Sequence, residues 1–419
     1  MLNMEGVAEF LTFGFTLEGK TMRKELTIPS LQVPDIDYSM SSRIEDVYHA
    51  LKESMRKSIQ SDSGLALSGG LDSRVLAGIA AELGEKIPTF TWGTSNFERT
   101  VARKVASLLK LPHYEISMDP RLSEKSIERL KQLVMETGGT VNVANLYVRT
   151  TLSQHLENHD IKALISATGF DEVNGAAFAH KVSSVRQFCD VFVQTFAHSM
   201  LPYEYREIAK KNLSKCCKKA SFCTLYPIVY VKNQFKTLKN GWPIEDITPV
   251  VDKKVLSSIV SLPYEKRINK RMQKTILRRY FPKLYKIPYA MSGLTPIMPY
   301  HSHIMMRKLV RALCVYIPKG RPRPLLTFDY QWFIKNNIRI FERFLYSNLP
   351  PLIDTKTVQK LLYRLQTNGS ISVHAVSRDG VFLDQLLTYA LLVSQLSGQE
   401  KHIKEKTSVD LRRSLAVPA

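Results

Sequence analysis

The chain has 419 residues, of which 44% are hydrophobic and 23% charged, and its formal net charge is +21. This composition is that of a globular protein with a large core, and it excludes a disordered or collagen-like chain. The sequence contains no apolar run long enough to span a bilayer and no charged-then-apolar leader. We therefore expect a cytoplasmic protein without a membrane partner.

The charge is concentrated in the second half of the sequence. Residues 201–419 carry a balance of +24, and residues 1–200 a balance of −3. Such asymmetry occurs in nucleic-acid surfaces, in solvated basic faces and in faces that attract an anionic substrate. No zinc knuckle, RNA-binding signature or dense Arg-Gly tract accompanies it, so a nucleic-acid partner is the less favoured interpretation.

The cysteines are too few for a disulfide scaffold. Cys216, Cys217 and Cys223 lie close together, but they form no CxxC pair and have no histidine at ligand spacing. We expect reduced, partly buried thiols here rather than a structural metal.

Short apolar segments alternate with helical ones in the first half of the chain. The segment 44–59 has apolar side chains at helical spacing. Strands are then expected at 64–68, 88–92, 113–117 and 162–167, and helices at 74–83, 99–110 and 123–136. This alternation predicts a doubly wound parallel α/β sheet, in which ligands bind at the carboxyl ends of the strands.

From about residue 176 the pattern changes to long amphipathic runs, which predicts a mainly helical second half. The runs cover 185–200, 204–220, 252–260, 270–281, 303–316, 327–346, 357–366 and 381–396. We expect a linker-like segment over 1–40, a main domain over 41–300 and a helical extension over 301–419 that ends in a basic tail.

One hexapeptide carries the strongest chemical signal: Ser68-Gly69-Gly70-Leu71-Asp72-Ser73. It follows an expected strand and opens an expected helix, as an anion-binding turn does. Glycines let backbone N–H groups approach an anion, and the helix start adds partial positive charge. Asp72 cannot itself bind a phosphate, so a metal bridging it to the anion is its natural role.

This hexapeptide resembles the PP-loop of the N-type ATP pyrophosphatases, which cleave ATP between the α and β phosphates and adenylate a carboxylate or carbonyl oxygen. Two further stretches resemble the asparagine synthetase family within that group. They are Thr89-Phe90-Thr91-Trp92-Gly93 and Ser166-Ala167-Thr168-Gly169-Phe170-Asp171-Glu172, the second followed by Gly175. Weaker likenesses at 10–21, 249–252 and 274–278 extend the resemblance from about residue 8 to residue 400.

The resemblance implies an adenine nucleotide alpha hydrolase-like fold that uses ATP and Mg²⁺. It implies that pyrophosphate is held by Ser68, Gly69, Gly70 and Ser73, and that Mg²⁺ is held by Asp72 and Asp171. It further implies that the nucleotide is contacted by Leu67, Trp92 and Gly169. The residues expected to act in catalysis are Thr168, Glu172 and Lys286.

Two positions depart from the family pattern. Thr168 stands where asparagine synthetases carry a glutamate, and a threonine hydroxyl is a poor base without a partner that takes its proton. The family's lysine near the transition state is also missing, because Ala290 or Met291 occupies its expected place. Lys286 is the nearest lysine, so we expect it, or another base, to substitute.

The resemblance implies a ligase that adenylates an aspartate-like carboxylate and transfers it to ammonia, with release of AMP and pyrophosphate. The family's glutaminase begins with a cysteine nucleophile, whereas this sequence starts Met-Leu-Asn. We therefore expect free ammonia or a separate glutaminase subunit as the amine source. The alternatives are a tRNA-modifying PP-loop enzyme and a catalytically weak nucleotide-binding subunit. The sequence leaves open the acceptor and the oligomeric state.

Overall fold

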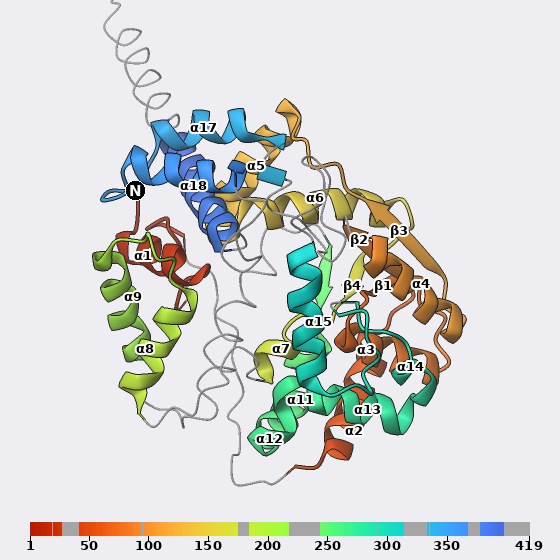
Figure 1. Cartoon of the computed structure of the whole chain (residues 1–419). Coiled ribbons are helices and arrows are strands. Elements are labelled where there is room, and N and C mark those ends of the chain that lie inside the picture. The colour runs from red at the N-terminus through yellow and green to blue at the C-terminus, as the bar shows by residue number, and fades with distance from the viewer. Residues whose placement is uncertain are drawn as a thin grey trace, which may run out of the picture.

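The chain was analysed as a computed structural model. It describes residues 1–18, 20–26, 42–93, 96–174, 184–217, 244–290, 292–313, 333–334, 336–367 and 378–397. Within these ranges a parallel sheet flanked by helices lies beside a group of helices drawn from both ends of the chain (Figure 1). No helix in the described ranges has both the length and the apolar character needed to cross a membrane.

The five strands of the sheet are all parallel, in the order β3-β2-β1-β4-β5. They are β1 (Ser63–Ala66), β2 (Thr89–Gly93), β3 (His113–Ser117), β4 (Ala163–Ile165) and β5 (Glu245–Ile247). The central strand β1 is buried throughout, as a parallel strand covered on both faces must be. The predicted doubly wound α/β fold and its four predicted strands are confirmed, while β5 was not predicted.

Helices connect successive strands, as parallel pairing requires. Helix α2 (Ile44–Ser58) precedes β1, and the helices that follow the first four strands are α3 (Leu71–Glu82), α4 (Asn96–Leu109), α5 (Glu124–Glu136), α6 (Val143–Glu157) and the short α7 (Phe170–Val173). Helix α5 begins at Ser123, whose side chain accepts a hydrogen bond from the Ser126 N–H and so caps the helix. Helix α6 was not predicted.

The chain after β5 returns to the sheet and covers α2 and α3. This part contains η1 (Pro249–Val251), α11 (Lys253–Val260), α12 (Tyr264–Arg267), η2 (Ile268–Lys270), α13 (Arg271–Tyr280), α14 (Pro282–Tyr285) and α15 (Tyr300–Leu313). Asp252 caps α11 by accepting from the Lys254 and Val255 N–H groups. The ring of Tyr280 stacks on Tyr48 of α2 with centroids 3.6 Å apart, which ties α13 to the sheet.

A second apolar core joins the two ends of the chain. Helices α5 and α6 contribute residues to this core, and its other helices are α1 (Met4–Phe13), α8 (Val185–Phe196), α9 (Tyr203–Cys216), α17 (Ile338–Ser347), α18 (Thr355–Thr367) and a helix over 378–397. We call these helices the helical body. Helix α1 packs against α8 and α9, and α17 and α18 lie above them in Figure 1. Within the described residues, the predicted mainly helical character of the second half is confirmed, while the expected basic tail lies outside them.

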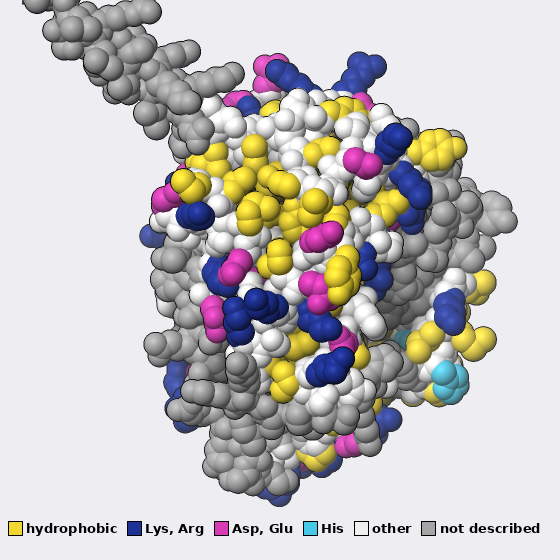
Figure 2. All heavy atoms as spheres, turned by 90° about the vertical axis from the view of Figure 1, so that its left-hand side faces the viewer, with side chains coloured by type: hydrophobic (Ala, Val, Ile, Leu, Met, Phe, Trp, Pro, Cys, Tyr) yellow, Lys and Arg dark blue, Asp and Glu magenta, His cyan; other side chains and the backbone are white. Residues whose placement is uncertain are grey.

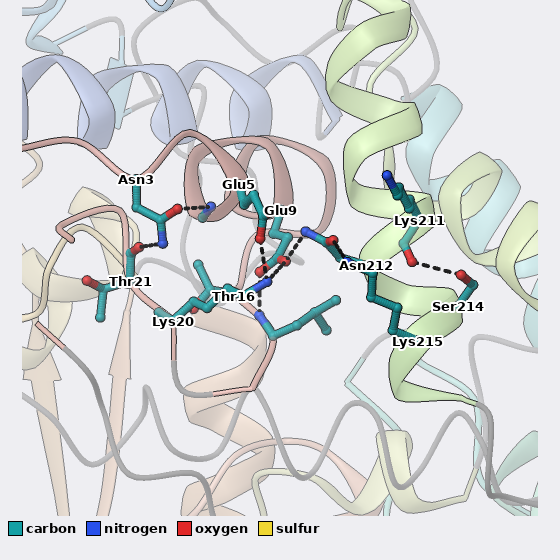
Figure 3. A network of polar contacts seen from close by, with 12 residues as sticks. Asn3, Glu5, Glu9, Thr16, Lys20, Thr21, Lys211, Asn212, Ser214 and Lys215 are labelled. Atoms are coloured by element: carbon teal, nitrogen blue, oxygen red, sulfur yellow. Dashed lines mark hydrogen bonds and ion pairs between the residues drawn. The ribbon is translucent and has the colours of Figure 1, made fainter.

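A buried carboxylate fixes α1 to α9 (Figure 3). Glu9 is fully buried and accepts hydrogen bonds from the Leu17 N–H at 2.7 Å and the Asn212 side-chain amide at 2.8 Å. The Lys20 ammonium lies 3.3 Å from the same carboxylate and 2.8 Å from Glu5. A buried charge needs such partners, and here they come from both segments. The first 20 residues are therefore fastened to a helix almost 200 positions away.

The described thiols lie in the helical body. Cys189 and Cys217 are buried, Cys216 is half-buried, and all three are free thiols. Cys223 and Cys314 lie outside the described residues. Within the described ranges no group of three His, Cys, Asp or Glu residues is placed to hold a metal ion.

Candidate active site

The Ser68–Ser73 loop leaves β1 and enters α3 at Gly70, the N-cap residue. Its two hydroxyls lie 2.9 Å apart, and the Ser73 oxygen accepts from the Ser68 N–H at 3.0 Å. The Gly70 N–H donates to Ser68 Oγ at 3.1 Å. The loop is thus ordered by its own side chains, with both hydroxyls held at the start of a helix.

Gly69 has no room for a side chain. A Cβ atom at this position would lie 2.3 Å from the Cβ of Ala290, which belongs to the segment after α14. The Ala290 N–H donates to the Gly69 carbonyl at 3.1 Å. The stretch in which the family's lysine is expected therefore does lie against the loop, but Ala290 brings no charge there, and Met291 lies outside the described residues.

Arg74 fastens this stretch to the loop. Its side chain is fully buried and donates to four backbone carbonyls, those of Gly69, Leu284, Ile287 and Pro288, at 2.8–3.3 Å. Carbonyls from two segments thus share one guanidinium, whose planar fork suits such a role. No motif had singled out Arg74.

A pocket of about 380 Å³ opens at the carboxyl ends of the strands. Six of the predicted site residues line it: Leu67, Ser68, Asp72, Ser73, Trp92 and Thr168. The two motifs, nearly 100 residues apart in sequence, therefore meet at one cavity. Gly69, Gly70, Gly169, Asp171, Glu172 and Lys286 do not line it.

One wall of the pocket comes from elements that the sequence did not indicate. Helix α6 contributes Asn145, Val148 and Arg149, and β5 contributes Asp246. Burial lowers the pKa of Arg149, and the nearby charge of Asp246 opposes this shift. Only the apolar face of α6, repeated at helical spacing, was available as a signal for this wall.

A chain of polar groups runs from Thr168 into the sheet. The Ser166 hydroxyl lies 2.9 Å from the Thr168 hydroxyl and 3.0 Å from a carboxylate oxygen of Asp246. An ionised carboxylate can only accept, and a hydroxyl carries one proton. Ser166 is the donor in both contacts, so its single proton serves either Thr168 or Asp246 at one time. Ser166 thus joins Thr168 to a carboxylate that lies two hydrogen bonds away.

Asp171 and Glu172 follow a glycine with left-handed backbone conformation. Gly169 has φ = +91°, a conformation that favours glycine, and α7 starts directly after it. Burial, helped by the charges of Asp171 and Asp72 and opposed by Lys270, raises the pKa of Glu172 to about 7. Glu172 and Asp171 thus belong to one charged cluster with Asp72.

Lys270, at the end of η2, joins the two predicted metal ligands. Its ammonium forms ion pairs with Asp72 and with Asp171. Gln273 donates to the other oxygen of Asp72 at 2.7 Å. Burial alone would lower the pKa of Lys270, but Asp72 and Asp171 raise it above its usual range, so the ammonium stays charged.

Two carboxylates suit Mg²⁺ when phosphate oxygens and water complete its octahedron. Asp72 and Asp171 fit this requirement, because one cation already contacts both. A metal ion at the same place would have to displace the Lys270 ammonium.

The predicted catalytic residues are not all brought together. Thr168 lines the pocket, and Glu172 lies in the cluster around Asp72. Lys286 is exposed and does not line the pocket. The roles assigned to these residues stay predictions.

Part of this chain is similar in sequence to known asparagine synthetases. The family model described as "Asparagine synthase" matches residues 46–222. The asparagine synthetase (glutamine-hydrolysing) of Zea mays is 23% identical over 236 residues, which cover 52% of this chain and 35% of that protein. A probable asparagine synthetase (glutamine-hydrolysing) of Schizosaccharomyces pombe is 25% identical over 59% of this chain and 43% of that protein. The chain thus spans well under half the length of these curated relatives.

Among solved structures, NMN synthetase from Francisella tularensis matches 45% of this chain and 91% of its own, at 16% identity and a TM-score of 0.22. This likeness is too slight to bear on the fold or the activity. The family match covers β1 to β4 with their helices and both motifs that meet at the pocket. Residues 46–222 therefore match the asparagine synthase family, and that match includes both motifs.

Proposed function

We propose that this chain activates an aspartate-like carboxylate with ATP and transfers it to ammonia, as a ligase that forms a C–N bond. The observation that carries the proposal is the meeting of the Ser68–Ser73 loop and the 166–172 motif at one pocket. An ATP-dependent amidation is what the family match supports in general terms. To this general reaction we add an aspartate-like carboxylate as acceptor and ammonia as the amine.

In the first step a carboxylate oxygen of the acceptor attacks the α-phosphorus of ATP. The bond from that phosphorus to the bridging oxygen breaks, and pyrophosphate leaves. The Ser68 and Ser73 hydroxyls and the start of α3 are proposed to hold the leaving anion. Leu67 and Trp92 line the apolar part of the pocket and would flank the adenosine.

The metal ligands of this step are proposed to be Asp72 and Asp171. Mg²⁺ bound there with the nucleotide would neutralise charge on the pyrophosphate. Glu172 lies beside these carboxylates and is proposed as a further acid or base.

In the second step the nitrogen of ammonia attacks the carbonyl carbon of the acyl-adenylate. The carbon–oxygen bond to AMP breaks, and the nitrogen loses a proton. Thr168 lines the pocket, and Ser166 contacts both the Thr168 hydroxyl and Asp246. We propose that Thr168 turns its hydroxyl to donate to Ser166 in this step, so that the proton passes along these contacts to the carboxylate. We propose that this path does the work of the glutamate that the family pattern carries at position 168.

The relatives are named as glutamine-hydrolysing enzymes, but this chain aligns with 35% and 43% of their lengths. For this chain we propose ammonia as the attacking amine, supplied free or by a separate glutaminase.

Exchange of labelled pyrophosphate into ATP, run with a panel of amino acids, tests the first step. We expect exchange that depends on an aspartate-like acid and disappears in Asp72→Ala and Asp171→Ala. Asp62→Ala is the matched control, because Asp62 lies at the opposite end of β1 and should leave exchange unchanged. Unchanged exchange in both pocket variants would refute the assignment.

The same assay separates the two alternative functions. ATP binding without exchange for any acid would identify a nucleotide-binding subunit. Strongly salt-dependent tRNA binding would identify a tRNA-modifying enzyme. Lys and Arg side chains on the face in Figure 2 are interspersed with Asp and Glu rather than gathered into a basic track, which favours neither tRNA nor DNA on that face.

A further inference from the structure

The backbone around Lys270 is unusual for a residue at the edge of a helix. Asn269 and Lys270 are both left-handed, with φ of +56° and +60°. Neither is a glycine, and consecutive left-handed residues with side chains are rare because each Cβ crowds the following carbonyl. Such conformations persist where the surroundings hold them, and they gather at functional sites. Here the turn aims the Lys270 side chain at the start of α3.

The Lys270 ammonium has little contact with water and two acidic partners. Its side chain is 16% exposed, and that of Asp72 is 19% exposed. One oxygen of Asp72 faces the Lys270 ammonium, and the other accepts from Gln273. The Asp171 oxygen nearest the site also faces Lys270. Both oxygens of Asp72 are therefore occupied by groups of the chain itself.

The described part of the stretch after α14, in which the family pattern has a lysine, brings no positive charge to Asp72 and Asp171. The 286–290 stretch brings Ala290 to the loop, and its lysine, Lys286, is exposed. Lys270 enters from a different element, outside the residues that match the family model. It supplies one positive charge beside the loop that we assign to pyrophosphate.

We infer that Lys270 is a built-in counter-ion of this site, which holds Asp72 and Asp171 in place of a divalent cation until nucleotide arrives. The inference rests on the proposed function for its nucleotide, but not for its cation. Two consequences follow. Without nucleotide, the chain binds divalent cations weakly at this place. The affinity for nucleotide also depends less on a divalent cation than it would without Lys270, because the ammonium already balances part of the negative charge of the two carboxylates.

The first test measures Mn²⁺ binding to the nucleotide-free protein by the loss of the free-ion paramagnetic resonance signal. We expect Lys270→Ala to bind one Mn²⁺ at least 10-fold more tightly than the unchanged chain, and to gain thermal stability when Mn²⁺ is added. Lys266→Ala, four residues earlier and exposed, is the matched control and should behave like the unchanged chain. Adding Asp72→Ala to Lys270→Ala should abolish the gained site.

Equal Mn²⁺ affinity in the unchanged chain and in Lys270→Ala would overturn the inference. Circular dichroism checks that the variant folds, and Lys270→Gln, which keeps most of the side-chain length without charge, replaces it if it does not. The Gln variant should show the same gain of Mn²⁺ affinity.

The second test measures ATP affinity with Mg²⁺ and with a chelator. Removal of Mg²⁺ should lower the ATP affinity of the unchanged chain by less than about 10-fold. The ATP affinity of Lys270→Ala should fall considerably more, because no cation then lies between the two carboxylates and the phosphates. Equal losses in both proteins would contradict the inference. Absence of ATP binding in every condition would instead refute the proposed function, and the Mn²⁺ result would still stand or fall independently.

Discussion

Three side chains determine where the proton of the attacking nitrogen goes in the proposed second step. Thr168 has a hydroxyl that is a weak base alone, and Ser166 connects it to the carboxylate of Asp246. Asp246 is buried, at 7% exposure, so a proton that reaches it is sheltered from water. The path depends on Ser166, because nothing else in it touches both ends.

Replacing Ser166 by alanine should therefore separate the two steps. Pyrophosphate exchange should stay within about 3-fold of the unchanged chain, whereas ammonia-dependent amide formation should fall by roughly 100-fold, the low end of the range for loss of acid–base assistance. Both rates are measured on the same preparation. Ser58→Ala, a half-buried serine at the last position of α2, serves as control.

An equal fall of both rates in Ser166→Ala would show that Ser166 only shapes the pocket. The proton route through Asp246 would then have to be abandoned.

The residues that matched known motifs were predictable, and those that join the motifs were not. Ser68, Asp72 and Thr168 sit in contiguous patterns whose spacing carries the signal. Lys270 and Asp246 reach the site through tertiary contacts nearly 80 residues or more from their partners. A lone lysine at the end of a short helical turn has no spacing of its own, so only the fold reveals its role.

At the scale of elements, the loop between β1 and α3 works as one unit with the segment after α14. Arg74 joins their carbonyls, and Gly69 meets Ala290 with no space left between them. The helix start that we assign to pyrophosphate is thus held in position by a chain segment more than 200 residues away.

Gly69→Ala should weaken ATP binding by roughly 10-fold or more, since forcing a methyl group into a filled contact typically costs about 1–3 kcal/mol. The new Cβ would push directly on the Ala290 side chain. Adding Ala290→Gly should restore most of the lost affinity, measured by calorimetric titration with ATP. If the double variant binds no better than Gly69→Ala alone, the contact is not what positions the loop.

The elements themselves were predicted unevenly, for physical reasons. Strands β1 to β4 are bounded by turn residues and followed by amphipathic helices, so their pattern is clear. Strand β5 has three residues and no alternation, and it exists because β4 offers a free edge. The segment expected to be linker-like contains α1, whose residues 6–13 are buried against helices that follow much later in the chain.

At the scale of the whole molecule, Asp384 links the 378–397 helix to the start of α6. Its side chain is 4% exposed, and the Ala144 N–H donates to its two oxygens at 3.0 and 3.3 Å. Burial raises the pKa of Asp384 to about 7, while the bond from Ala144 opposes the shift. The folded chain therefore holds a proton there that the unfolded chain releases near pH 4.

This raised pKa makes stability fall as pH rises. The stabilisation from protonated Asp384 is complete below about pH 4 and is lost as pH rises through about 7. Asp384→Asn keeps a hydrogen-bond acceptor without the charge. The free energy of unfolding, measured with urea at pH 5, 7 and 8.5, should therefore increase for the variant relative to the unchanged chain as the pH rises.

The exposed Glu124→Gln on α5 is the control for that series and should follow the unchanged chain. A constant difference between Asp384→Asn and the unchanged chain across the three pH values would show that Asp384 is ionised throughout.

The packing of α1 in one core with the 378–397 helix also has a consequence for the synthesis of the chain. Helix α1 leaves the ribosome well before the 378–397 helix, whose Gln385 donates to the Phe10 carbonyl at 3.0 Å. The described strands emerge in between, so the sheet can form during translation. The apolar side chains of α1 meet α8 and α9 at that stage, but their packing is completed only when residues 378–397 have been synthesised. A chaperone that shelters α1 in the nascent chain would therefore act until that point.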